Sequence, residues 1–300
     1  NMKRKKKLKT KNFLVFIIII ILIITSIIYG INKSKNNNTN SKEQNKIENK
    51  DKVNDTKELT ELEKAKKDLA YYKDEYEDAY KEYREKNKDL SIEKVITNVN
   101  IGLNYDYYTH TKATKDLNTN TILVNKYNYL TEDYVPENLQ TVDKKYSSKT
   151  LQLVDYAKEA FEELSEAASK ENYTVLAMSS YRSYQYQYNL YNRYVNTDGI
   201  EAADTYSARP GYSEHQTGLA VDVYNGKEDF TNFEKTKEYN WMQDNAYKFG
   251  FILRFPKDKV LETGYQYESW HYRYVGKEIA KYIHDNNLCF EEYYATHLIK

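Results

Sequence analysis

Two histidines and an aspartate, carried by two separate segments, have the residue types of a hydrolytic metal site. His215 and Asp222 lie seven residues apart, and His271 follows further along the chain, three residues after Glu268. A catalytic zinc ion usually takes three protein ligands and leaves its fourth position for water. A free carboxylate beside the ion can act as the general base. The sequence therefore predicts Zn²⁺ held by His215, Asp222 and His271, with Glu268 as the base.

The segments that carry these residues have the pattern of short strands. Residues 219–224 are apolar and β-prone apart from Asp222, which a strand places on the face opposite Val221. A lone aspartate among apolar residues is costly to bury unless it is paired or bound to a metal. Residues 270–275 form a second such strand. Because residues three apart on a strand point to opposite faces, Glu268 must lie on the loop that enters it.

Taken singly, each histidine would indicate only a hydrogen-bonded polar residue. The conjunction of two histidines and two acids, each in a segment suited to its role, is what favours a metal site. Gly211 and Gly218 bracket His215, and the conformational freedom of glycine allows this loop to fold back toward Asp222.

The same residues resemble the motifs of a known family. Residues 213–222, SEHQTGLAVD, match the SxHxxGxAxD motif of the VanY/LdcB-type zinc carboxypeptidases. Residues 268–276, ESWHYRYVG, resemble the second signature of that family. Residues 180–183, SYRS, resemble its third element, a turn ahead of a helix. The three motifs occur in the order of the family and cover about residues 91–300.

This resemblance implies a zinc peptidase that removes the C-terminal D-alanine from peptidoglycan stem peptides. It implies an α+β fold with helices packed on a small antiparallel sheet, as in lysostaphin-type peptidases and the hedgehog signalling domain. It places Arg182 in the pocket, where a guanidinium group can stabilise negative charge that develops on the scissile carbonyl. It also indicates four residues that contact the substrate: Ser213, Gln187, Tyr181 and Trp270.

The motifs leave the choice of bond open. We favour a D,D-carboxypeptidase, but an L,D-carboxypeptidase acting on tetrapeptide stems or a peptidoglycan endopeptidase would use the same chemistry. The contacts that separate them are expected in loops such as 225–232 and 255–266. The alternative from another class is a zinc-containing module that binds the cell wall without catalysis. The presence of both Glu268 and Arg182 argues against that module.

The first 31 residues have the composition of a membrane anchor. Residues 1–12 hold seven Lys or Arg and no acid, and residues 13–31 are almost entirely apolar. As a helix this run would span about 28 Å. The basic flank stays cytoplasmic. An uncleaved anchor is favoured over a cleaved signal peptide because no small-residue cleavage site follows. The sequence thus predicts a single-pass protein of the cell membrane whose catalytic domain is extracellular.

Two segments separate this anchor from the peptidase domain, which we expect over residues 91–300. Residues 32–57 are rich in Asn, Lys, Ser and Glu, a composition typical of a disordered tether. Residues 58–90 carry a seam at alternating spacings of three and four, which predicts a helical stalk or a short coiled coil that forms a weak homodimer. The seam comprises Leu62, Ala65, Leu69, Tyr72, Tyr76, Ala79 and Tyr83.

Hydrophobic periodicity within residues 91–300 predicts strands and helices without regular βαβ alternation, which indicates an α+β fold. Ser91 has the type of a helix N-cap. The expected strands are 122–130, 173–178, 219–224, 251–255 and 270–275. The expected helices are 92–99, 147–170, 183–195, 198–206, 235–249, 276–286 and 290–298.

The charge balance and the cysteine count exclude some partners. Apart from the seven basic residues of the flank, 38 Lys and Arg face 45 Asp and Glu. This acidic excess argues against binding to nucleic acid or to acidic wall polymers through bulk charge. The single Cys289 cannot form an intramolecular disulfide, and we interpret it as a structural residue.

Overall fold

Residues 61–299 are described by the structure, a computed structural model. The expected basic flank, anchor and tether (residues 1–57) lie outside the described residues. Among the described helices, none is both long and apolar enough to cross a membrane. Residues 65–300 form one of two units of the chain and contain every residue of the predicted site.

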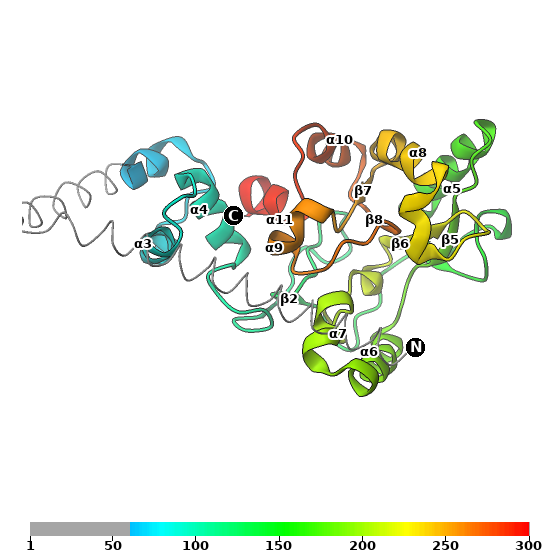
Figure 1. Ribbon diagram of the computed structural model, residues 1–300, viewed down its shortest axis with the longest axis horizontal. Coiled ribbons are helices and arrows are strands. Elements are labelled where there is room, and N and C mark those ends of the chain that lie inside the picture. Colours follow the sequence, from blue (N-terminus) through cyan, green and yellow to red (C-terminus); the bar gives the residue numbers. More distant parts are fainter. Residues whose placement is uncertain (1–60, 300) are drawn as a thin grey trace, which may run out of the picture. The chain divides into compact units, whose positions relative to one another are not determined.

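A four-stranded antiparallel sheet lies at the centre of this unit (Figure 1). Its strands are ordered β5 (Leu176–Ser179), β6 (Ala220–Tyr224), β8 (His271–Tyr274) and β7 (Phe251–Leu253). The register pairs Asp222 of β6 with His271 of β8. The predicted antiparallel sheet is therefore confirmed, and pairing of two strands alone brings two of the predicted ligands together.

Alternation along the strands separates the core from the site. Val221 and Val223 of β6 join a hydrophobic core with Phe161 and Leu164 of α5 (Asp155–Lys170). The helix α8 (Lys237–Asn245) contributes Trp241 and Met242 to the same core. The apolar residues of α5 recur at three- and four-residue spacing, which is the stripe of an amphipathic helix. Asp222, on the alternate face of β6, is thus kept out of this core.

The helix expected over residues 147–170 begins only at Asp155. The preceding residues Gln152–Val154 form β4, which pairs with β3 (Leu139–Thr141) in a separate two-stranded sheet. A second core cluster joins Ile252 of β7 with Ala280 and Ile283 of α10 (Lys277–Asp285) and with Phe290 of α11 (Phe290–Tyr293). A π-helical turn, Tyr294–Leu298, continues α11.

The turn after β5 leads into α6 (Tyr184–Asp198) and α7 (Ile200–Tyr206). The Ser183 hydroxyl accepts a hydrogen bond from the N–H of Tyr186 at 3.2 Å, which satisfies one of the unpaired donors at the helix start. Ser91 caps α4 (Ile92–Ile101) in the same way. The Ser91 cap agrees with the sequence prediction.

The strand predicted over residues 122–130 is wrong for most of its length. Only Asn128–Tyr129 (β2) is a strand, and it pairs in parallel with Lys112–Ala113 (β1). The Asn125 side chain accepts hydrogen bonds from the backbone N–H groups two and three residues ahead, at 3.0 and 3.1 Å. Such side-chain bonds compete with a strand ladder and produce a turn.

The helix expected over residues 58–90 is interrupted ahead of Glu77. A turn and a 3₁₀ helix, Asp74–Tyr76, precede α3 (Glu77–Lys86), which packs on α4. Tyr80 of α3 is fully buried, and its hydroxyl donates to Asn100 Oδ1 at 2.8 Å. Part of the tyrosine-rich segment is thus buried within its own chain. The pairing of two molecules stays a prediction.

Replacing Tyr80 by alanine tests how firmly α3 belongs to this unit. Removal of a fully buried aromatic side chain leaves a cavity, so we expect the free energy of unfolding to fall by about 3–5 kcal/mol. In the exposed Tyr188→Ala control it should change by at most about 0.5 kcal/mol. Urea unfolding followed by circular dichroism measures both, and equal effects would show that α3 does not stabilise the fold.

Candidate metal centre

The loop that carries His215 is shaped by two glycines. Gly211 has φ 84° and Gly218 has φ 68°, both in the left-handed region that favours glycine. A Cβ atom at Gly211 would lie 2.8 Å from the Leu130 carbonyl oxygen. Between them, the 3₁₀ turn Glu214–Thr217 leads directly into β6. The predicted return of His215 toward Asp222 is confirmed.

The three predicted ligands converge in one buried cluster. Oδ1 of Asp222 lies 3.4 Å from His215 Nε2 and 3.3 Å from His271 Nδ1. The candidate ligand atoms of the three residues all lie within 4.8 Å of one another, and no other such cluster occurs among residues 61–299. Two imidazoles and one carboxylate are a frequent zinc ligand set.

The hydrogen bonds of His215 leave one nitrogen free for a ligand bond. Its Nδ1 lies 2.7 Å from the Ser180 carbonyl oxygen. Since a carbonyl only accepts, Nδ1 carries the proton and Nε2 presents its lone pair to Asp222. Burial, together with the nearby charge of Arg182, lowers the pKa of His215 to about 4. The ring is therefore neutral at neutral pH, as metal binding requires.

The two oxygens of Asp222 have different surroundings. Oδ2 accepts a hydrogen bond from Arg182 Nη2 at 2.6 Å, whereas the buried Oδ1 has no hydrogen-bond partner among the described residues. Burial alone would raise the pKa of Asp222, but His215 and Arg182 hold it well below its usual range. A buried, charged oxygen that faces two ring nitrogens fits a cation ligand.

Arg182 lies where the sequence predicts, although it also has a contact that was not predicted. Besides binding Asp222, its Nε and Nη2 donate to the Ser179 hydroxyl at 3.0 and 2.9 Å. The guanidinium group therefore orients a ligand as well as lining the cavity. Its Nη1 makes no hydrogen bond within residues 61–299 and remains available to a substrate oxygen.

Glu268 lies on the loop before β8, as strand alternation predicts. Its Oε2 is 3.4 Å from His271 Nδ1, and 13% of its side chain is exposed. Burial raises the pKa of Glu268 to about 7, with a further upward contribution from Asp222. A carboxylate with this pKa can take up and release a proton near neutral pH, as a general base must.

Glu214 is a residue of the centre that the sequence reasoning missed. Its Oε1 accepts hydrogen bonds from Arg254 Nε and Arg273 Nη1, both at 2.8 Å. Its Oε2 lies 3.6 Å from His271 Nε2. A charged residue next to His215, in a segment that leads into a buried strand, was the available signal.

The cluster opens into a cavity of about 460 Å³. Glu268 and Arg182 line it, as do three of the four predicted substrate contacts, Ser213, Gln187 and Trp270. Tyr181 is not among the lining residues, and its backbone N–H instead donates to the Gln152 carbonyl at 3.0 Å. The side-chain amide of Gln187 donates to the Ala208 carbonyl at 2.7 Å, while its buried Oε1 has no partner among the described residues.

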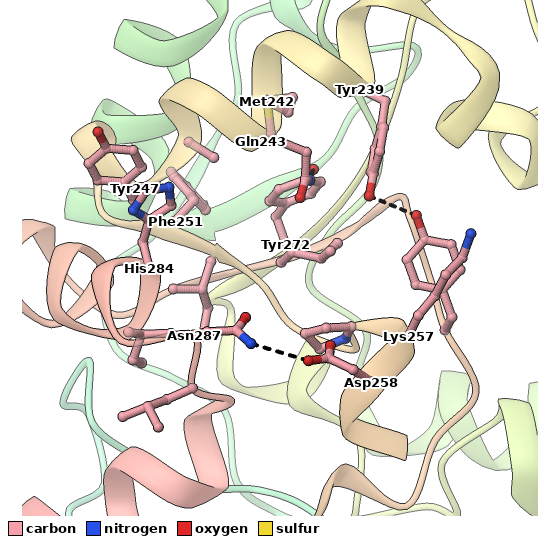
Figure 2. A pocket seen from close by; sticks show the side chains of 17 residues that line it. Tyr239, Met242, Gln243, Tyr247, Phe251, Lys257, Asp258, Tyr272, His284 and Asn287 are labelled. Carbon is pink, nitrogen blue, oxygen red and sulfur yellow. Dashed lines mark hydrogen bonds between the residues drawn. The ribbon is translucent and has the colours of Figure 1, made fainter.

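A second cavity, of about 300 Å³, contains none of the metal-ligand candidates (Figure 2). Tyr272, the residue after His271 on β8, points into it beside Gln243. Hydrogen bonds between Tyr267 and Tyr239, and between Asn287 and Asp258, lie at its edge. His271 and Tyr272, neighbours on β8, thus line different cavities, because side chains alternate along a strand.

Comparison with known proteins identifies the family. The family model described as D-alanyl-D-alanine carboxypeptidase, VanY, matches residues 150–277. The bifunctional D-Ala-D-Ala dipeptidase and D-Ala-D-Ala carboxypeptidase VanXYC of Enterococcus gallinarum is 31% identical over 57% of this chain and 92% of its own length. The chain belongs to the VanY family. The match contains His215, Asp222, Glu268 and His271.

Other members of the VanY family agree in sequence and fold. The putative carboxypeptidase YodJ of Bacillus subtilis is 45% identical over 57% of this chain and 66% of its own length. The LdcB LD-carboxypeptidase structure is 42% identical, with a TM-score of 0.55 over 58% of this chain and 85% of that one. A D,D-pentapeptidase VanY structure with Zn(II) is 34% identical, with a TM-score of 0.51. The match covers 58% of this chain and 98% of that one. The chain spans about a third to two thirds of the length of the first three curated relatives.

Replacing His215 by alanine should abolish zinc binding at this VanY-type centre. The variant loses one of three ligands, while the exposed His110 lies outside the cluster and its alanine variant should bind zinc like the wild type. Competition with a chromogenic zinc chelator measures the affinity of each protein. Tight zinc binding that survives in His215→Ala would show that the ion is held elsewhere.

Proposed function

We propose that this protein is a zinc-dependent D,D-carboxypeptidase that removes the terminal D-alanine from peptidoglycan stem peptides. The observation that carries the proposal is the convergence of His215, Asp222 and His271 at one edge of a cavity, with Glu268 beside them. The D-alanyl-D-alanine carboxypeptidases of the family support the choice of substrate.

Bound zinc would act as a Lewis acid that activates water and polarises the scissile carbonyl. Its ligands would be His215, Asp222 and His271. Glu268 takes a proton from the attacking water on its carboxylate and later delivers it to the nitrogen of the leaving D-alanine. The exposed part of Glu268 faces the cavity where both exchanges must occur.

Arg182 contributes in two ways. Its Nη2 fixes Asp222, and its Nη1 can donate to the oxygen that becomes negative when the carbonyl is attacked. Ser213 and Gln187 line the same cavity and are the candidates for binding the terminal D-alanine, and Trp270 forms part of the wall. Oε1 of Gln187, which has no partner among the described residues, can accept a hydrogen bond from a substrate N–H.

A second candidate function is L,D-carboxypeptidase activity on tetrapeptide stems. It is favoured by the greater identity to the LdcB LD-carboxypeptidase, 42% against 34% for the zinc-bound VanY. Incubation with defined penta- and tetrapeptide stems, followed by mass spectrometry, separates the two. Loss of one alanine from the pentapeptide alone supports D,D activity, whereas loss from the tetrapeptide alone supports L,D activity.

We further infer that the enzyme is a single-pass protein of the cell membrane whose catalytic domain lies outside. The inference rests on the basic residues 1–12 and the apolar run 13–31. Such an anchor, with residues 32–57 as a tether, would hold the enzyme near its wall substrate. Protease digestion of intact cells tests this topology, since an exterior domain is cleaved and a cytoplasmic one is protected.

Replacing Glu268 by glutamine should separate metal binding from catalysis. We expect kcat to fall by about 10²- to 10⁴-fold because the proton acceptor is lost. Zinc affinity should stay close to that of the wild type, since Glu268 is not one of the three ligands. Stem-peptide hydrolysis and zinc titration are measured on the same preparation. Wild-type kcat in this variant would contradict the role of Glu268 as base.

Removal of the metal provides an independent check. Treatment with a chelator should abolish hydrolysis, and one equivalent of Zn²⁺ should restore it, because the proposed mechanism needs a Lewis acid to lower the pKa of the water before Glu268 can take its proton. Hydrolysis that persists after complete removal of metal, confirmed by elemental analysis, would exclude the zinc mechanism.

A further inference from the structure

We propose that Glu214 is a positioning residue for the metal centre, which fixes the orientation and the tautomer of His271 through its Nε2. This inference rests on the proposed zinc site. Nδ1 of His271 faces Asp222, so Nε2 must carry the proton when Nδ1 binds a metal. Metal-binding histidines generally donate that second N–H to a carboxylate or a carbonyl group.

The hydrogen bonds of Glu214 are divided unevenly between its two oxygens. Arg254 and Arg273 both donate to Oε1, each at 2.8 Å. The buried Oε2 receives no hydrogen bond from the described residues. A carboxylate that served only as a counter-ion to two guanidinium groups could share its four lone-pair sites between them. Here both donors converge on one oxygen, and the other is left facing His271.

The surroundings of His271 indicate the same pair of atoms, Nε2 of His271 and Oε2 of Glu214. This nitrogen is buried, has no hydrogen-bond partner in the described part of the chain, and lies 3.6 Å from Oε2 of Glu214. The rings of Phe255 and His215 lie 4.8 and 4.9 Å from the imidazole, centroid to centroid. The separation of 3.6 Å is slightly longer than a hydrogen bond, as catalytic contacts often are before ligands bind.

The remaining arginine donors hold Glu214 in place. Arg254 donates to both oxygens of Glu291, at 2.8 and 2.6 Å, and Arg273 donates to the carbonyl oxygen of Ile122 at 2.7 Å. Both guanidinium groups are fully buried. Because these partners come from α11 and from the segment 119–123, the carboxylate of Glu214 is fixed from elements outside the motif that contains it.

The variant Glu214→Gln tests the proposal with almost no change in shape. The amide oxygen can still accept from both arginines, but the NH₂ group then faces Nε2 of His271. Two donors cannot share a hydrogen bond, so the ring would favour the tautomer that is protonated on Nδ1, which cannot bind the metal. We expect the zinc dissociation constant to rise about 10- to 100-fold.

Glu292→Gln is the matched control. Like Glu214, Glu292 pairs with two cations, Lys94 at 2.7 Å and Lys259 at 2.9 Å, but it lies on α11 without contact to the cluster. Its amide variant should lower the melting temperature but leave the zinc dissociation constant within about twofold of the wild type. Equal zinc affinities in wild type and Glu214→Gln would overturn the proposal. Wild-type protein that binds no zinc would contradict the proposed function itself.

Nitrogen-15 NMR of the zinc-loaded wild type provides a test that requires no variant. We expect the His271 Nε2 proton to be visible and to exchange slowly with water, because the proposal places it in a hydrogen bond to the buried carboxylate of Glu214 once zinc is bound. A proton that is absent from Nε2, or that exchanges as fast as that of an exposed histidine, would overturn the proposal even if Glu214→Gln did not fold.

Discussion

One carboxylate oxygen, Oδ1 of Asp222, is shared between two buried imidazole rings. It lies 3.4 and 3.3 Å from their nitrogens and has no hydrogen bond of its own among the described residues. An unsatisfied buried polar atom costs about 1–3 kcal/mol, and more if it is charged. A cation placed between the oxygen and the two nitrogens removes that cost. The β6–β8 register and the His215 loop together bring the three atoms into this arrangement, which a bound cation would stabilise.

The acids around the cluster differ in the arginines that bind them. Arg182 binds Oδ2 of Asp222 and leaves Oδ1 to the metal, while two further arginines bind one oxygen of Glu214. Glu268, in contrast, forms no ion pair with an arginine or a lysine within residues 61–299. Its carboxylate is thus the one that remains free to exchange protons. The three acids that we propose as ligand, positioning residue and base thus differ in the cations that bind them.

The parts of the site that depend on local pattern could be predicted from the sequence. Alternation on two short strands placed Asp222 on the face opposite the core and Glu268 on a loop, and both positions are confirmed. The hydrogen bonds that hold Glu214 in place could not be predicted in this way. Its arginine partners lie 40 and 59 residues further along the chain, and only the tertiary fold brings them together.

The two failures of prediction have different causes. The apolar segment 122–130 has the composition of a strand, but the Asn125 side chain replaces the ladder with a turn. The tyrosine-rich seam of residues 58–90 is typical of a stalk, yet α3 packs on α4 of the same chain and buries Tyr80. In the first case, local hydrogen bonds of one side chain override the strand pattern, and in the second a tertiary contact overrides the stalk pattern.

The central claim is that three side chains hold one zinc ion, and anomalous X-ray scattering tests it most directly. Diffraction from zinc-loaded crystals, measured on both sides of the zinc absorption edge, locates the ion without reference to activity. We expect one strong peak at about 2.0–2.2 Å from His215 Nε2, Asp222 Oδ1 and His271 Nδ1. A peak that lies elsewhere, or no peak between these three atoms at saturating zinc, would contradict the account.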